Sequence, residues 1–291
     1  MKLKYINQIK ININNFSNKR TSNLLDGTYR SVYKGKSLNF DGLRAYEIND
    51  DVKDIDWKSS SRSGQVLVKQ YVSDKKHNIL FILDTGEKME AYANVRDIKK
   101  ELALYTAGTL GYLAVKNGDF IGFLFNEDKK TNFLPFKCNI DNLEEYLVTY
   151  EKHMTIKDKF NINDSLNYIV KNLKKRMIIF IITDLGGIDK MDNNLLRQLS
   201  FYNDIMLINI EDMNMVGDEL YDIDSSNYIP SIFLNDKTLN ELEENIKNNM
   251  FIDNKHKFNK NRIDMVSIGK MEDINIRIIE LLERHRYGNN R

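Results

Sequence analysis

Two aspartates that directly follow runs of apolar residues are the groups in this chain whose type and spacing could do chemistry. Asp84 follows Ile79–Leu83, and Asp184 follows the apolar run 177–183. Such short runs are typical of buried parallel strands, whose carboxyl ends meet at the edge of a sheet where ligands bind. Two carboxylates there, with nearby hydroxyls, would suit Mg²⁺ or Mn²⁺. The structural alternative is that each aspartate caps the following helix.

The loop after Asp84 argues against a divalent cation. Gly86 offers only its backbone, and Lys88 brings a positive charge. An ammonium beside two aspartates would occupy the volume that a cation needs. We therefore hypothesise that Lys88 forms an internal salt bridge with Asp84 or Asp184, and we expect no cofactor.

A second polar cluster surrounds Trp57, the only tryptophan. It interleaves carboxylates with cations: Asp50, Asp51, Asp54 and Asp56 with Lys53, Lys58 and Arg62. One interpretation is an acidic active site. Because the cations would neutralise the carboxylates, we favour a salt-bridge network that holds this segment onto the sheet around Trp57.

Other catalytic motifs are missing from the sequence. There is no Walker-type phosphate loop and no dinucleotide-binding fingerprint, and Gly186-Gly187 is interpreted as a turn. The four histidines lack metal-ligand spacing, and the serines at 59–63 show no catalytic triad order. We therefore expect a protein that is not an enzyme.

Predicted strands and helices alternate along the chain, and they must position the two aspartates. Strands are predicted at 65–72, 79–83, 120–125, 131–136, 177–183, 205–210 and 263–268, and helices at 95–115, 140–150, 163–173, 191–201, 239–250 and 274–285. This alternation predicts an α/β fold with a mostly parallel sheet and helices on both faces. A more polar stretch at about 211–237 predicts a hairpin insert.

Composition excludes some classes of protein. The chain has 291 residues, a net charge of +1 and one cysteine, so no intrachain disulfide can form. No apolar run is long enough to span a bilayer, and the N-terminus is a poor signal peptide, so we expect a cytoplasmic protein. The first forty residues carry eight lysines and arginines against one acidic residue. We interpret them as a short helix or irregular arm with a solvated surface, and an anionic partner is the alternative.

An ordered set of motifs resembles the bacterial and archaeal family called domain of unknown function 58. The matching segments are Gly27-Thr28-Tyr29-Arg30-Ser31, Gly35-Lys36-Ser37-Leu38-Asn39-Phe40, Arg44-Ala45-Tyr46, Asp50-Asp51-Val52, Ile55-Asp56-Trp57-Lys58, Arg62 and Val68-Lys69-Gln70. The resemblance implies a von Willebrand A-like α/β domain. Many relatives are encoded beside MoxR-type AAA+ ATPases, and many begin with transmembrane helices, which this chain lacks.

The sequence departs from that family's pattern at several positions. Asn49 and Asn39 stand where a glycine and an acidic residue are usual, and Lys53 replaces an arginine. The metal-ion-dependent adhesion site of von Willebrand A-like domains reads Asp-x-Ser-x-Ser, followed by a later threonine and a later aspartate. Only Asp84 and Asp184 match it; Gly86 and Lys88 replace the serines, and 161–165 contains no threonine. The resemblance therefore implies a degenerate metal site.

Together these observations predict a family-specific prefix at 1–75 and a von Willebrand A-like domain at 76–291. We expect a non-enzymatic protein-interaction module that partners a MoxR-type AAA+ ATPase in protein assembly or activation. Its interaction residues would be Lys88 with Arg44, Tyr46, Asp50, Asp51, Asp56, Trp57, Lys58 and Arg62. Two alternatives stay open: a metal-dependent hydrolase of the phosphoesterase type using Asp84 and Asp184, and a nucleic-acid binder using the basic N-terminal residues.

Overall fold

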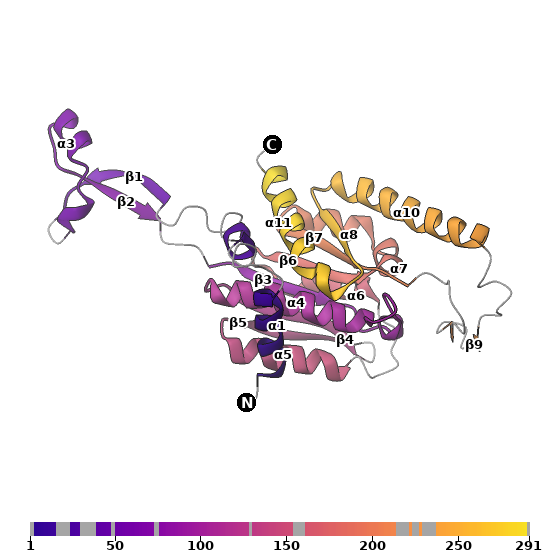
Figure 1. The fold of residues 1–291 in the computed structure, drawn as a ribbon. Coiled ribbons are helices and arrows are strands. Elements are labelled where there is room, and N and C mark those ends of the chain that lie inside the picture. The colour runs from indigo at the N-terminus through magenta and orange to yellow at the C-terminus, as the bar shows by residue number, and fades with distance from the viewer. Residues whose placement is uncertain are drawn as a thin grey trace.

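A six-stranded sheet forms the centre of the molecule (Figure 1). The structure is a computed structural model that describes residues 3–15, 24–29, 39–47, 50–72, 76–127, 130–153, 161–213, 221–222, 227–228 and 237–289. The strand order is β10-β7-β6-β3-β4-β5, and every pair is parallel except β4 with β5. The strands are β3 (Asn78–Leu83), β4 (Phe120–Glu127), β5 (Lys130–Lys137), β6 (Ile178–Asp184), β7 (Asp204–Ile210) and β10 (Asp264–Ile268). The predicted α/β fold is confirmed, and the strand predicted at 131–136 corresponds to β5, which pairs antiparallel with β4.

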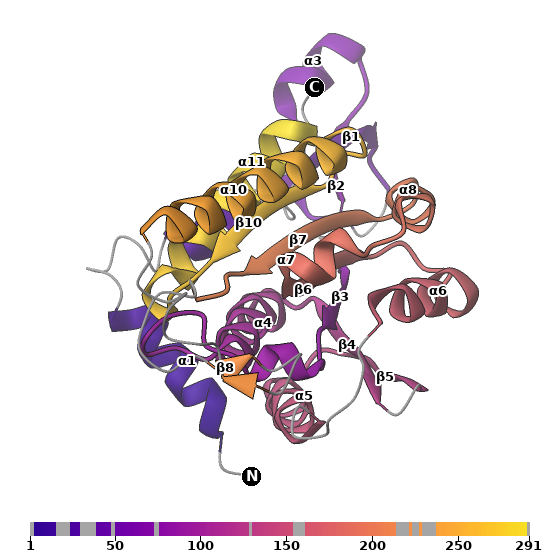
Figure 2. The same cartoon turned by 90° about the vertical axis from the view of Figure 1, so that its right-hand side faces the viewer.

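Helices cover both faces of this sheet (Figure 2). One face packs on α1 (Lys4–Asn15), α4 (Lys99–Lys116), α5 (Ile140–His153) and α11 (Ile274–Asn289). The other packs on α6 (Ile162–Asn172), α7 (Leu185–Asp189), α8 (Asn193–Ser200) and α10 (Lys237–Asn259). Because both faces are covered, the central strands are apolar along nearly their whole length. In the described part of the chain, no helix is both long and apolar enough to cross a membrane.

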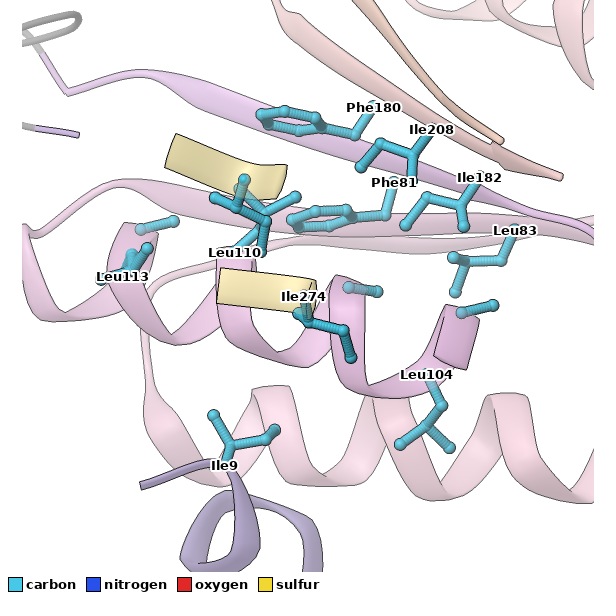
Figure 3. Packing of buried hydrophobic residues seen from close by; sticks show 14 of the residues in the cluster. Ile9, Phe81, Leu83, Leu104, Leu110, Leu113, Phe180, Ile182, Ile208 and Ile274 are labelled. Atoms are coloured by element: carbon cyan, nitrogen blue, oxygen red, sulfur yellow. The ribbon is translucent and has the colours of Figure 1, made fainter. Parts of the chain in front are cut away.

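Aromatic rings from neighbouring strands fill the core beneath α4 (Figure 3). Phe81 stacks on Phe180 with ring centroids 5.5 Å apart and meets Phe123 edge-on at 5.2 Å. Leu110 of α4 and Ile182 of β6 belong to the same buried cluster. This packing fixes α4 over the sheet and so positions its first turn at the carboxyl ends of the strands.

The N-terminal helix α1 is part of this body. Ile6 and Ile9 are fully buried, and the carboxylate of Glu144 accepts hydrogen bonds from the backbone N–H groups of Tyr5 (3.0 Å) and Ile6 (2.9 Å). A Cβ on Gly108 of α4 would lie 2.4 Å from Cδ1 of Ile9, so glycine permits this close approach. The expected helix in the first forty residues is confirmed, and it shares the core of the sheet. The domain division at residue 75 stays a prediction.

A small arm projects from the body (Figure 1). It comprises β1 (Asn39–Ala45), η1 (Val52–Asp54), α3 (Trp57–Ser63) and β2 (Leu67–Val72), and β1 pairs antiparallel with β2. These elements pack mainly on one another. The predicted insert at 211–237 contains β8 (Tyr221–Asp222) paired antiparallel with β9 (Asn227–Tyr228), which confirms a hairpin there; most of the remaining insert lies outside the described residues.

Candidate functional site

The two strand-end aspartates meet at the carboxyl edge of the sheet. Strands β3 and β6 are neighbours, and the backbone N–H of Asp84 donates to the carbonyl of Ile182 at 3.1 Å. Both aspartate side chains are buried. The prediction that Asp84 and Asp184 share one end of the sheet is confirmed.

Hydrogen bonds engage both carboxylate oxygens of Asp84. Oδ1 accepts from the N–H of Gly86 (2.8 Å), and Oδ2 accepts from the hydroxyl of Thr183 (2.5 Å). Tyr150 fixes the same turn, because its hydroxyl donates to the carbonyl of Asp84 at 2.7 Å. Burial, together with the charge of Asp184, raises the pKa of Asp84 to about 6.

Asp184 has a different environment because a buried lysine contacts it. Its Oδ2 accepts from Nζ of Lys99 at 2.9 Å, and its Oδ1 accepts from the N–H of Gly187 at 2.7 Å as the N-cap of α7. The capping alternative is therefore confirmed for this residue. Burial works against its charged form, but the ammonium of Lys99 holds the pKa of Asp184 below its ordinary value.

Lys99 lies in the first turn of α4 and is 1% exposed. Its ammonium also donates to Asp212, in the loop after β7, so it bridges two carboxylates. Burial favours the neutral amine, yet these two carboxylates raise the pKa of Lys99 above its ordinary value. We call Asp84, Lys99, Thr183, Asp184 and Asp212 the strand-end site.

Lys99 and Thr183 were missed from sequence. The helix predicted at 95–115 placed Lys99 one turn inside the helix, whereas α4 begins at Lys99, so its place at the end of the sheet gave no signal. The sequence predicted Lys88, in η2 (Glu87–Glu90), as a partner of the aspartates, and that salt bridge stays a prediction. The structure shows an ion pair between Asp184 and Lys99, which was not predicted. Lys88 lies close by: its Nζ is 3.5 Å from the place of a Cβ on Gly186, and its charge also lowers the pKa of Asp184.

Gly186 and Gly187 lie in the first turn of helix α7, which begins at Leu185, so their interpretation as a turn was wrong. A Cβ on Gly187 would lie 2.1 Å from the hydroxyl oxygen of Thr183. Glycine is required there because the helix must start close enough to donate to Asp184 while Thr183 donates to Asp84. A Cβ on Gly186 would meet only ordinary contacts.

The donor set does not fit a divalent cation. Mg²⁺ and Mn²⁺ need about six oxygen ligands, and this site offers three engaged carboxylates, one hydroxyl and an ammonium. The hydroxyl of Ser165 donates to Oδ1 of Asn126 (3.1 Å), whose Nδ2 donates to the carbonyl of Asn161 (2.8 Å), so these groups bond to one another. Within the described ranges, no three His, Cys, Asp or Glu residues are placed to hold a metal.

The carboxylates of the arm have local structural roles. Arg44 donates to both oxygens of Asp50, at 2.8 and 2.5 Å, and this pairing lowers the pKa of Asp50. Asp51 caps η1, and Asp56 caps α3 by accepting from the N–H of Ser59 at 2.9 Å.

The expected network that holds the prefix onto the sheet around Trp57 is therefore wrong. Trp57 is 64% exposed, and the carboxylates satisfy groups a few residues away in the arm. Lys58, Arg62 and Tyr46 are also exposed. The family-signature residues thus divide into an internal scaffold and an exposed set.

A family model described as protein of unknown function DUF58 matches residues 42–219, which is more than half of the chain. The chain belongs to the DUF58 family. The DUF58 match begins within β1, so it includes the arm as well as the sheet through β7. Among curated proteins, none matches this chain.

Several solved structures resemble this DUF58 protein at low sequence identity. BatB of Bacteroides thetaiotaomicron, described as a conserved hypothetical protein, is 14% identical, with a TM-score of 0.48 over 72% of this chain and 98% of that chain. An aerotolerance-related membrane protein of Bacteroides fragilis is 13% identical (TM-score 0.45; 72% and 99% covered), and the SpRpn10 VWA domain is 10% identical (0.41; 72% and 95%). The α/β fold itself is established by the order and direction of the strands in this chain.

Proposed function

We propose that this DUF58 protein is a non-enzymatic protein-interaction module that works with a MoxR-type AAA+ ATPase in the assembly or activation of other proteins. The observation that carries the proposal is the composition of the arm's surface. Among its described side chains the arm buries only two apolar ones, Ile55 and Val68, and it exposes four large apolar ones: Tyr46, Val52, Trp57 and Val66.

A two-stranded sheet with so small a core has little stability of its own. Covering the exposed side chains with a partner protein would supply the missing burial. Tryptophan is enriched among the residues that dominate binding energy at protein interfaces, so Trp57 is the natural anchor. The Arg44–Asp50 pair and the two aspartate caps hold the backbone in place before any partner arrives.

The strand-end site supports a binding role over hydrolysis. A metal-dependent phosphoesterase needs carboxylates free to coordinate metal and activate water. Here Asp84 and Asp184 are occupied by Thr183, Lys99 and backbone N–H groups. The site therefore joins α4, β3 and β6 through hydrogen bonds and the Lys99–Asp184 ion pair.

The test is binding to a MoxR-type AAA+ ATPase encoded in the same genome. We expect the wild-type chain to co-purify with it, and Trp57→Ala to weaken binding about 30-fold, the effect of losing a hot-spot residue. The matched control is Phe201→Ser, which alters an exposed aromatic on the body and should bind normally. Unchanged binding by Trp57→Ala would contradict the proposal. Phosphatase activity with Mn²⁺ that is lost in Asp84→Ala would favour the hydrolase instead.

A further inference from the structure

The amino ends of the parallel strands form an edge that combines exposed aromatic rings with cations. We call it the amino edge and define it by Lys76, Lys174, Lys175, Arg176, Phe201, Tyr202 and Arg262. Each of these residues lies in the connection that enters a parallel strand: β3, β6, β7 or β10. All seven are exposed. The chain as a whole has a net charge of only +1, so this edge is locally basic.

Phe201 and Tyr202 stand at the centre of the amino edge. They connect α8 to β7 and are 79% and 68% exposed. Their rings meet edge-to-face, with centroids 4.8 Å apart and an interplanar angle of 76°. Because β7 lies between β10 and β6, the aromatic pair has Arg262 on one side and Lys174–Arg176 on the other.

Two hollows show that these side chains share one surface. Tyr202 lines a hollow of about 250 Å³ together with Lys174 and Lys175, over a floor that includes Leu173 and Leu199. The next hollow, of about 360 Å³, is lined by Arg176 and Lys76. Tyr202 and the four lysine and arginine residues named here therefore line two hollows that meet where Lys175 is followed by Arg176.

Acidic groups at this edge offset only part of the charge. Asp204 lies 3.6 Å from Arg176, and Asp264 contacts His285. Lysines near helix ends are partly explained by the helix dipole, but that effect does not explain two large exposed rings. Arg262 adopts φ 59°, a left-handed conformation that glycine or asparagine favours, so the chain places a cation where a smaller residue would be easier.

We propose that the amino edge docks on the surface of a membrane that contains anionic phospholipid. An apolar ring flanked by lysine and arginine is the side-chain combination that binds the boundary between head groups and acyl chains. Phe201 would enter that boundary, Tyr202 would lie at the level of the head groups, and the cations would contact lipid phosphates. Single-stranded nucleic acid fits less well, because successive bases stack in parallel and these rings lie 76° apart.

The test is co-sedimentation of the full chain with vesicles of phosphatidylcholine alone or mixed with phosphatidylglycerol. We expect binding only to the mixed vesicles, and binding that falls as salt is raised. Lys174→Gln/Lys175→Gln should bind about 30-fold more weakly, because each lysine near an anionic surface contributes independently. Phe201→Ser should bind about tenfold more weakly, because the apolar contact is lost.

Matched controls come from the opposite edge of the sheet. Lys190→Gln/Lys270→Gln changes two exposed lysines there, and Tyr92→Ser changes an exposed aromatic. Both controls should sediment like the wild type. The proposal is overturned if mixed vesicles do not bind at low salt, if phosphatidylcholine alone binds equally well, or if the controls lose as much binding as the amino-edge variants. Salt-sensitive binding of a single-stranded DNA oligonucleotide without vesicle binding would also overturn it and would assign the edge to nucleic acid.

Discussion

Nζ of Lys99 lies 2.9 Å from Oδ2 of Asp184, and both side chains are almost fully buried. The two residues are 85 positions apart in the sequence. Their contact ties the first turn of α4 to the end of β6, and the contact of Lys99 with Asp212 extends it to the loop after β7. A protonated lysine therefore supplies, from within the chain, the positive charge that this edge of the sheet requires.

Lys99→Met should destabilise the protein strongly. The change keeps an unbranched side chain of similar length but leaves the buried Asp184 carboxylate without its ammonium. Breaking a buried pair in this way costs about 3–5 kcal/mol in the free energy of unfolding. Urea unfolding of wild type and variant measures the difference.

The neighbouring lysine provides the control for that measurement. Lys100 pairs with Glu90 at a partly exposed position, so Lys100→Met should cost less than about 1 kcal/mol. Equal losses for the two variants would show that the buried pair has no special role. The double variant Lys99→Met/Asp184→Asn should regain part of the loss, because it removes the uncompensated charge.

Added Mg²⁺ or Mn²⁺ should not stabilise the wild-type chain. A ligand that binds only the folded state raises the midpoint of thermal unfolding, and a site already occupied by an ammonium gives a divalent cation no such binding. Thermal unfolding with and without each ion, supported by calorimetric titration, measures the effect. A midpoint that rises with ion concentration, and falls back in Asp84→Asn, would show a working metal site.

The sheet could be predicted from sequence because its strands are buried on both faces. Runs such as Ile79–Leu83 are apolar throughout, and that pattern does not depend on distant contacts. In the arm, the strand predicted at 65–72 corresponds to β2, but its partner β1 was not predicted. Strand β1 contains an irregularity between Phe40 and Gly42 that breaks the alternation of inward and outward side chains. Its pairing with β2 depends on residues about thirty positions away.

The strand-end site was only half predictable for a related reason. The positions of Asp84 and Asp184 could be predicted because each directly follows an apolar run that forms a strand. Thr183 belongs to the same apolar run, and its hydroxyl reaches Asp84 only because β6 lies beside β3 in the observed register. Lys99 reaches Asp184 through the packing of α4, which sequence spacing does not encode. Only Lys88, the lysine nearer to Asp84 in the chain, could be proposed from sequence.

Asp84→Asn should change how stability depends on pH. The folded-state pKa of Asp84 is about 6, above its ordinary value of 3.8, so the folded protein binds this proton more tightly than the unfolded chain does. Ionised Asp84 therefore destabilises the fold, and stability from this group is lost as pH rises from about 4 to 6. Relative to wild type, the variant should gain up to about 3 kcal/mol across that interval.

Unfolding midpoints at a series of pH values from 4 to 7 measure this gain. Asp184→Asn is the contrasting variant, because the pKa of Asp184 is lowered by Lys99. It should be less stable than wild type at pH 7, and the deficit should shrink only as pH falls below the ordinary range of an aspartate. A constant difference between Asp84→Asn and wild type over the whole series would contradict the assignment.

Gly187→Ala should destabilise the protein, and Gly186→Ala should not. The new Cβ at Gly187 would lie 2.1 Å from the Thr183 hydroxyl oxygen, so α7 or Thr183 must move and the hydrogen bond to Asp84 weakens. Overpacking of this kind costs about 1–3 kcal/mol. At Gly186 the nearest atoms would be 3.5 and 3.6 Å away, which is ordinary contact. Denaturant unfolding of the two alanine variants makes the comparison, and equal stability would show that α7 adjusts freely.

Trp57 should report directly on the arm, because it is the only tryptophan in the chain. At 64% exposure its indole is open to water, so acrylamide should quench its fluorescence in the folded protein nearly as well as in urea. Trp57→Phe supplies the blank. Binding of a MoxR-type AAA+ ATPase to the arm should shield the ring and shift its emission to shorter wavelength. Strong protection from acrylamide without any partner would instead show that Trp57 packs against the body. That result would contradict the proposal that a partner binds the arm.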